Sequence, residues 1–195
     1  LGLKGQATAT LNFGDDNQCI GWLLGEENKG LTYMFQLMNS ARIHTGIQAI
    51  SQASNAYQHA LDYANTRLQG RSVTSRDPDS SQVPIIQHAD VRRMLLTQKA
   101  YVEGVTALLL YCGKLGDLHR VAETDADRER PYQLLEILTP VCKAYASDVA
   151  FESINLAMQV YGGSGYMEDY PIAQLLRDNR VFSIYDGTNS IQAMD

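Results

Sequence analysis

The stretch from residue 31 to residue 68, LTYMFQLMNSARIHTGIQAISQASNAYQHALDYANTRL, decides the fold. Apart from one arginine, its apolar and small residues recur at steps of three and four, which is the period of an α-helix with one buried face. The positions concerned are Leu31, Met34, Phe35, Met38, Arg42, Gly46, Ala49, Ala53, Tyr57, Ala60, Ala64 and Leu68. The spacing therefore predicts one long helix over about residues 29–69.

Two further helices are expected after this stretch. Residues 70–83 are rich in Ser, Asp and Arg and predict a loop, after which Pro84 stands where a second helix would begin and run to about Leu115. A charged stretch at 123–130 is expected to separate that helix from a third, which ends at Gly162 and Gly163. Short helices are expected after Pro171 and from about residue 189. The prediction is a mainly α protein that forms an antiparallel helical bundle.

Residues 1–24 have a different pattern, because their apolar residues do not follow the helical period. They predict two short strands joined by a turn at 14–17. The chain begins without methionine or a basic, apolar leader, and it ends within a segment of helical spacing. We therefore expect it to be a piece of a longer protein.

Composition excludes several classes of protein. The chain has 195 residues, 16 Lys+Arg against 22 Asp+Glu, and a net charge of −6, so it lacks the basic surface expected of a nucleic-acid or anionic-membrane partner. No apolar run approaches the roughly 18 residues that span a bilayer, which predicts no membrane insertion. Three cysteines without a CxxC pair argue against a disulfide framework, and neither they nor the four histidines have the spacing of metal ligands.

Three features are candidates for chemistry, and each has two interpretations. Arg42 lies on the buried stripe of the first helix, either at its exposed edge or as a buried cation that orients a carboxylate or ligand. The glycine cluster at 162–166 either ends a helix or lets a ligand approach the backbone. Asp186, in the segment 184–189 (IYDGTN), is either a turn residue or a carboxylate able to act as a base.

The order of these motifs resembles the C-terminal part of the acyl-CoA dehydrogenase family. The most specific segments are QVYGGSGY at 159–166 and IYDGTNSIQ at 184–192, supported by LGEENKGL at 24–31 and YANTR at 63–67. The segments DVRRML at 90–95 and QGR at 69–71 are similar to the branch that contains 3-methylmercaptopropionyl-CoA dehydrogenases. The resemblance implies that residues 1–24 end a middle β-domain and that 25–195 form a four-helix bundle.

The resemblance also implies a reaction and its residues. An FAD-dependent enzyme would remove an α-proton from an acyl-CoA with a carboxylate and transfer the β-hydride to flavin N5. Asp186 occupies the position of the base, where the family normally has Glu, and Gly187 would contact the substrate. Asn39 and Arg42 match positions near the acyl-CoA. An alternative position for the base in the family, on the first helix, is Ala41 here and cannot accept a proton.

The cofactor positions fall into two groups in the family. Thr188 and Ser190 match contacts to the FAD of the same subunit. Arg67, Gln69, Gln159, Gly162 and Gly163 match positions that contact the FAD of a neighbouring subunit. His88 aligns with a flavin-contacting stretch, although Ala89 replaces its usual Gln. A homodimer or homotetramer is therefore implied.

The resemblance further implies an electron-transfer flavoprotein as acceptor. It implies a cytoplasmic location in a bacterium, or the mitochondrial matrix in a eukaryote. The alternative function is a non-catalytic helical oligomerisation or binding protein that retains the same scaffold. A DNA-associated member of the family is disfavoured by the net charge.

Overall fold

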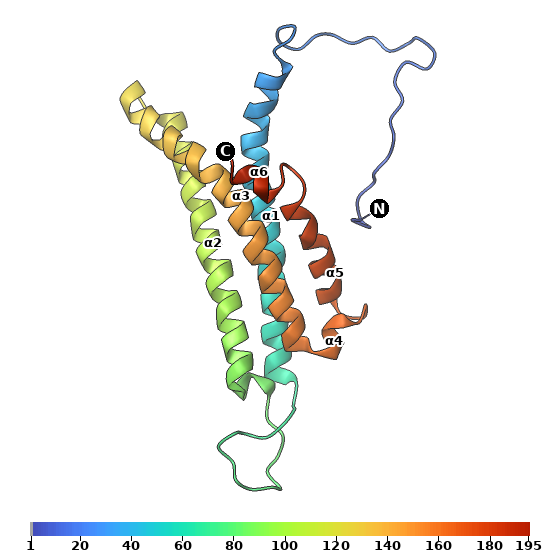
Figure 1. The fold of residues 1–195 in the computed structure, drawn as a ribbon, viewed down its shortest axis with the longest axis vertical. Coiled ribbons are helices and arrows are strands. Elements are labelled where there is room, and N and C mark those ends of the chain that lie inside the picture. Colours follow the sequence, from blue (N-terminus) through green and yellow to red (C-terminus); the bar gives the residue numbers. More distant parts are fainter. Residues whose placement is uncertain (1) are drawn as a thin grey trace.

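Three long antiparallel helices form the body of the computed structural model, which describes residues 2–195 apart from the side chain of Gln36 (Figure 1). They are α1 (Gly30–Thr66), α2 (Ala89–Val121) and α3 (Asp125–Tyr161). The shorter elements are the 3₁₀ turn η1 (Ile85–Gln87), α4 (Gly163–Tyr166), α5 (Pro171–Asn179), the 3₁₀ turn η2 (Arg180–Ser183) and α6 (Asn189–Gln192). The predicted helical bundle is confirmed, with α5 as its short fourth member.

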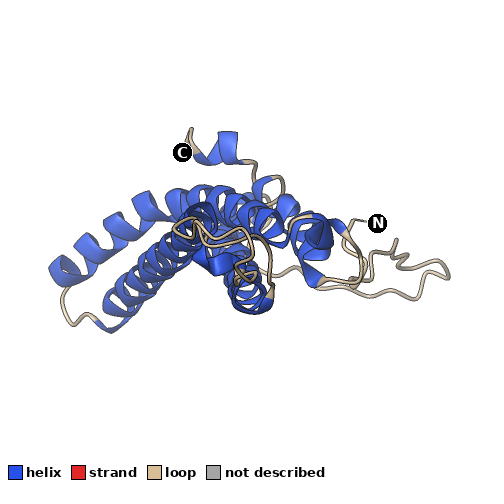
Figure 2. Cartoon of the chain, turned by 90° about the horizontal axis from the view of Figure 1, so that it is seen from below, coloured by secondary structure: helices blue, strands red, loops and turns tan. Residues whose placement is uncertain are grey.

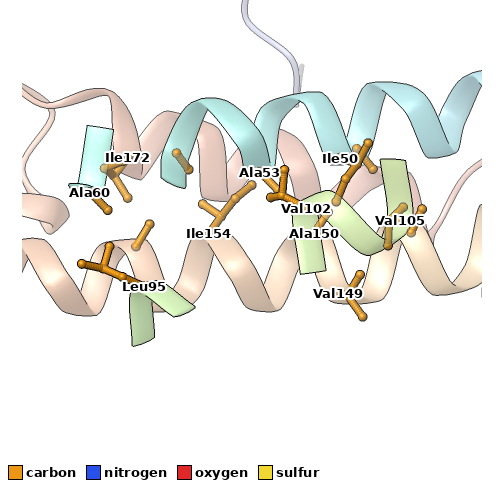
Figure 3. Close-up of a cluster of buried hydrophobic side chains, with 14 of the residues drawn as sticks. Ile50, Ala53, Ala60, Leu95, Val102, Val105, Val149, Ala150, Ile154 and Ile172 are labelled. Carbon is orange, nitrogen blue, oxygen red and sulfur yellow. The ribbon is translucent and has the colours of Figure 1, made fainter. Parts of the chain in front are cut away.

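The core lies where α1 and α2 pack against α3, with α5 closing the side formed by α1 and α3 (Figure 3). The face of α1 that enters the core consists mainly of alanines, and these are fully buried: Ala49, Ala53, Ala56, Ala60 and Ala64. Small side chains let two helix backbones approach closely. At Gly46 the approach is closer still, because an added Cβ would lie 3.0 Å from the carbonyl oxygen of Cys142. The thiols of Cys112 and Cys142 meet between α2 and α3 with their Sγ atoms 3.2 Å apart.

The start of α3 corrects one prediction, since only Glu123 and Thr124 of the charged stretch at 123–130 lie between α2 and α3. Thr124 caps α3, and its Oγ1 accepts a hydrogen bond from the backbone N–H of Asp127. Asp125 and Asp127 occupy the first turn, where carboxylates interact favourably with the helix dipole. The charged residues from Asp125 onward therefore form the first turns of α3.

The connection from α1 to α2 corrects two boundaries. The first helix ends at Thr66, before the predicted residue 69, because Leu68 and Pro84 form an antiparallel bridge and Gln69 N–H bonds Val83 O at 3.0 Å. The second helix does not start at Pro84 and run unbroken. The extended backbone of His88 separates η1 from α2. Helix α2 then continues to Val121, beyond the predicted end at about Leu115.

Several residues that spacing assigned to buried faces are exposed. They are Leu31, Met34 and Phe35 in α1. Three- and four-residue steps also select residues at the edges of the buried face. Such residues are buried only where a neighbouring helix covers them. In Figure 1 the first turns of α1 stand apart from α3, and no other helix packs on them there.

The predicted strands in residues 1–24 are not formed in the described part, which begins at residue 2, and no strand occurs elsewhere in residues 2–195 (Figure 2). This tail is exposed and contains only turns, such as the one closed by Asn17 N–H and Gly14 O at 2.9 Å. A strand needs a neighbour for its hydrogen bonds, and the described chain supplies none. Within the same residues, no helix has both the length and the apolar character to cross a membrane.

Candidate functional site

Most of the candidate residues gather at two places along the bundle. The first is the segment between η2 and α6, residues 184–189, which we call the Asp186 turn. The second is a cavity at the end of the bundle where α1 ends and α2 begins, which we call the Arg67 cavity. Along α1 the 21 residues from Thr45, beside the turn, to Thr66, beside the cavity, span about 30 Å.

The Asp186 turn has an unusual backbone. Asp186 has a φ of 54° and Gly187 a φ of 79°, so both residues occupy the left-handed region. Asp tolerates this conformation better than most residues, and at position 187 a Cβ would lie 2.7 Å from Nε2 of Gln192. The same Nε2 donates to the carbonyl oxygens of Asp186 and Gly187, both at 3.2 Å. The turn is therefore closed by its own following helix.

The carboxylate of Asp186 faces α1. Its Oδ2 lies 2.8 Å from the hydroxyl Oγ1 of Thr45, a residue that is 2% exposed. The same hydroxyl lies 3.0 Å from the carbonyl oxygen of Ala41, one helical turn earlier. The carboxylate is thus oriented by a buried donor, while Asp186 itself remains half-buried and reachable.

A buried lysine of α3 also contacts this turn. Nζ of Lys143 donates to the carbonyl oxygen of Gly187 at 2.7 Å and to Oδ1 of Asn189 at 2.9 Å. Burial lowers the pKa of Lys143, while the negative charges of Asp186 and Asp148 act in the opposite direction. The turn is therefore attached to α3 as well as to α1.

The structure resolves the two interpretations of Arg42 in favour of the buried cation. Arg42 is 9% exposed, and its guanidinium forms an ion pair with Asp195 at 2.7 Å. Its Nε is buried without a hydrogen-bond partner in the described chain. Asn39 is exposed and lines a separate cavity of about 490 Å³ with Cys112 and Tyr132, so it is not brought to the Asp186 turn.

The Arg67 cavity has a volume of about 800 Å³ and lies between the end of α1, the start of α2 and the end of α3. Six of the predicted cofactor residues line it: Arg67, Gln69, His88, Gln159, Gly162 and Gly163. The ring Nε2 of His88 lies 2.8 Å from the carbonyl oxygen of Gln69 and links the two sides of the loop. Within residues 2–195 the exposed guanidinium of Arg67 forms no ion pair, so its charge is available to a ligand.

The glycines at 162, 163 and 165, beside this cavity, differ in whether the backbone or the packing requires a glycine. Gly162 ends α3 with a φ of 60°. A Cβ at Gly165 would lie 2.7 Å from Cβ of Tyr161 and 2.9 Å from the carbonyl oxygen of Met158, so packing demands a glycine there. A Cβ at Gly163 would meet no atom within 4 Å. The helix-ending interpretation is thus confirmed at Gly162, whereas packing inside the chain gives no reason for the glycine at 163.

The two remaining predicted cofactor residues lie away from this cavity. Thr188 and Ser190 are exposed and flank the start of α6, next to Asp186. A cavity of about 720 Å³ adjoins the same turn and is lined by Ile184, Tyr185, Arg180 and residues of the N-terminal tail. The structure therefore separates the predicted cofactor residues into one group of six and one group of two.

Sequence reasoning missed three residues that bond to the Asp186 turn, namely Thr45, Lys143 and Gln192, and it did not foresee that Asn189 bonds to α3. A signal existed for the lysine. Thr139, Lys143 and Ser147 recur at four-residue steps on the face of α3 that is buried. Among the described residues, no group of three or more His, Cys, Asp or Glu side chains is placed to hold a metal ion.

Comparisons with known proteins match this chain over nearly its whole length. The family model described as "Acyl-CoA dehydrogenase, C-terminal domain" matches residues 28–195. A butyryl-CoA dehydrogenase of Syntrophomonas wolfei subsp. wolfei is 42% identical over 200 residues, covering 100% of this chain and 32% of the relative. A 3-methylmercaptopropionyl-CoA dehydrogenase of Ruegeria pomeroyi is 44% identical over 195 residues, with the same two coverages.

A solved structure gives the same match. Butyryl-CoA dehydrogenase from Megasphaera elsdenii superposes with a TM-score of 0.69 at 27% identity, covering 87% of this chain and 38% of that one. The chain spans about a third of the length of the curated relatives it matches.

Proposed function

Because this chain belongs to the acyl-CoA dehydrogenase family, we propose that the protein containing it oxidises an acyl-CoA thioester to its α,β-unsaturated product. In this proposal residues 1–24 end a middle domain, and 25–195 form the helical domain that carries the base. The family match from residue 28 supports this division. The observation that carries the proposal is the carboxylate of Asp186, held on a left-handed turn by a buried hydroxyl.

The residues fit an FAD cofactor. The Arg67 cavity offers a guanidinium without an ion pair in the described chain and two exposed amide side chains, Gln69 and Gln159. Phosphate and ribose oxygens are the acceptors that such donors prefer. The open space over Gly163 lets a ligand lie against the backbone. When bound, the flavin accepts the hydride that leaves the β-carbon.

Asp186 would then remove the α-proton of the thioester. A general base must lie within hydrogen-bond reach of the proton that it accepts. The hydrogen bond from Thr45 aims one carboxylate oxygen, while the other keeps its lone pairs for the substrate. Ala41 bears no acceptor, so no second base stands at the alternative position on α1. Gly187, Asn39 and Arg42 would contact the substrate, and Thr188 and Ser190 the nearby FAD.

The distance between the two groups supports an oligomer. A hydride acceptor has to lie about 3–3.5 Å from the atom that reacts. The Arg67 cavity lies about 30 Å along α1 from the carboxylate of Asp186. We therefore assign the two groups to two FAD molecules bound in different subunits of a homodimer or homotetramer. Sedimentation of the holoprotein, with one FAD per chain, tests this assignment.

The test of the reaction is flavin reduction in the full-length protein. The holoprotein is mixed without oxygen with a panel of acyl-CoA thioesters, and flavin absorption is followed. At least one thioester is expected to bleach the flavin, while free CoA leaves it oxidised. Reoxidation by an electron-transfer flavoprotein then tests the proposed acceptor. If every thioester in the panel leaves the flavin oxidised, the alternative of a non-catalytic binding protein on the same scaffold takes its place.

A further inference from the structure

Lys143 is the largest fully buried side chain in the described part of the chain, with 0% of its surface exposed. A buried ammonium loses its hydration and is tolerated only where hydrogen bonds or opposite charges replace it. Hydrophobic packing alone therefore does not account for a lysine at this position. The hydrogen-bonding contacts of Lys143 must therefore explain why a lysine is buried here.

Those contacts all go to the Asp186 turn. Nζ donates to the carbonyl oxygen of Gly187 at 2.7 Å and to Oδ1 of Asn189 at 2.9 Å. No carboxylate of the described residues lies within 4.0 Å of it. The lysine thus directs its donors to the backbone and an amide of the turn, instead of neutralising a neighbouring acid.

Asn189 strengthens the same attachment. Its Nδ2 donates to Oγ of Ser147 at 3.0 Å and to Oδ1 of Asp148 at 2.7 Å, about one helical turn after Lys143, so two successive turns of α3 hold the Asp186 turn. On the other side, Thr45 of α1 donates to the carboxylate of Asp186. A turn with two consecutive left-handed residues persists only when its surroundings hold it. These contacts provide that restraint.

We propose that Lys143 is a positioning residue: by binding the carbonyl oxygen of Gly187 it fixes the turn that aims the carboxylate of Asp186. This inference rests on the proposed dehydrogenation for its kinetic consequence. The carbonyl of Gly187 lies one residue beyond Asp186, so a rotation of this backbone swings the carboxylate. A misplacement of about 1 Å in a reacting group lowers a rate by about 100-fold.

The first measurement does not depend on catalysis. Backbone amide hydrogen exchange is compared between the full-length holoprotein and its Lys143→Met variant, which keeps the length of the side chain but has no donor. Exchange is expected to become faster in residues 184–192 and to stay unchanged in the core of α2 at 102–115. The control is Lys99→Met, which makes the same chemical change at an exposed lysine paired with Glu103. This control should leave both regions unchanged.

The second measurement is single-turnover flavin reduction by an acyl-CoA. Lys143→Met is expected to lower the rate constant by about 100-fold without changing the amplitude, because flavin content and folded fraction are retained. An acyl-CoA deuterated at the α-carbon should show a larger isotope effect in this variant, since proton removal becomes slower. A lysine that only fills the core would change the amplitude and leave the rate constant and isotope effect as they are.

A second variant covers the case in which Lys143→Met fails to fold. Asn189→Ala removes the other acceptor of Nζ and the bonds to Ser147 and Asp148 without altering the buried face of α3. It should show the same faster exchange in 184–192 and a smaller loss of rate, about 10-fold.

Two results decide the inference. Unchanged exchange at 184–192 in both variants would overturn it, because the turn would then be held without the lysine. Faster exchange there supports it even if no acyl-CoA reduces the flavin of the parent protein. That last outcome would remove the proposed reaction and leave the attachment of the turn intact, so the two failures are distinguishable.

Discussion

The Asp186 turn and the Arg67 cavity are built from the same kinds of residues and use them in opposite ways. Each brings together a cation, two side-chain amides and at least one glycine. Around the turn these are Lys143 of α3, Gln192 of α6, and Asn189 and Gly187 of the turn itself. In the cavity they are Arg67, Gln69, Gln159 and Gly163.

The two regions differ in whether their polar groups are buried and in whether those groups have bonding partners within the chain. The cation of the turn is fully buried and hydrogen-bonded within the chain, whereas that of the cavity is exposed and forms no ion pair in residues 2–195. Groups whose hydrogen bonds are completed internally hold a geometry, and groups whose bonds are left open bind a ligand. The comparison teaches that residue type alone does not tell a positioning site from a binding site.

The largest expected effect separates the two regions directly. Asp186→Asn keeps the size of the side chain and the tolerance for the left-handed backbone, but it cannot accept a proton. Flavin reduction by acyl-CoA in the full-length protein should fall by about 10²- to 10⁴-fold. Flavin content should stay at the parent level, because the substitution changes none of the predicted FAD-binding residues. A variant that reduces flavin as fast as the parent would show that Asp186 is only a turn residue.

The reverse pattern is expected at the cavity. Arg67→Met removes a charge-assisted bond to the cofactor, and we expect FAD to dissociate about 10- to 100-fold more readily, measured by flavin release on dilution. Once FAD is supplied in excess, the rate constant for flavin reduction should return to the parent value. The matched control is Arg93→Met, an exposed arginine paired only with Asp90. Equal FAD retention in both variants would mean that Arg67 does not contact the cofactor.

The sequence predicts the parts of the fold that are determined by residues close together in the chain, and it fails where distant segments decide. The three long helices follow from a repeat within each segment, and the end of α3 follows from Gly162 alone. The strands expected in residues 1–24 required neighbours that the described chain does not contain. Helix spacing also placed Phe35 inside, because spacing does not specify which side another helix covers.

The two sites were predictable to different degrees for the same reason. Asp186 and the glycine cluster stand out as local motifs, although only a resemblance to a family gave them roles. Lys143 was missed, since its partners lie 44 and 46 residues away and a lysine in a helix is usually exposed. The Arg67 cavity joins the ends of α1 and α3, which meet because both helices run antiparallel to α2 and therefore end on the same side of the bundle.

A third prediction tests whether Gly165 and Gly163 show the same difference, with one required for packing within the chain and the other for binding a ligand. Gly165→Ala places a Cβ 2.7 Å from Cβ of Tyr161, so we expect the full-length protein to lose about 1–3 kcal/mol of stability, measured as a lower Tm. Gly163→Ala meets open space and should leave Tm unchanged. Its Cβ would instead enter the cavity and weaken FAD binding by about 10-fold, or roughly 1.4 kcal/mol. Equal Tm losses in the two variants would contradict the distinction.

The smallest expected effect concerns Thr45, whose single hydroxyl proton has two possible acceptors. Oγ1 lies 2.8 Å from Oδ2 of Asp186 and 3.0 Å from the carbonyl oxygen of Ala41. Thr45→Val has the same shape and removes only the hydroxyl. If the proton goes to Asp186, the rate constant for flavin reduction should fall by about 2- to 10-fold, the equivalent of a net hydrogen bond of about 0.5–1.5 kcal/mol.

Thr45→Ser keeps the donor and should retain most of the rate. FAD binding should be equal in all three proteins, because the Thr45 hydroxyl bonds to none of the predicted FAD-binding residues, either at the Arg67 cavity or at Thr188 and Ser190. A valine variant with the parent rate would assign the hydroxyl to the carbonyl of Ala41, and the carboxylate of Asp186 would then be aimed by the attachment of its turn to α3 alone.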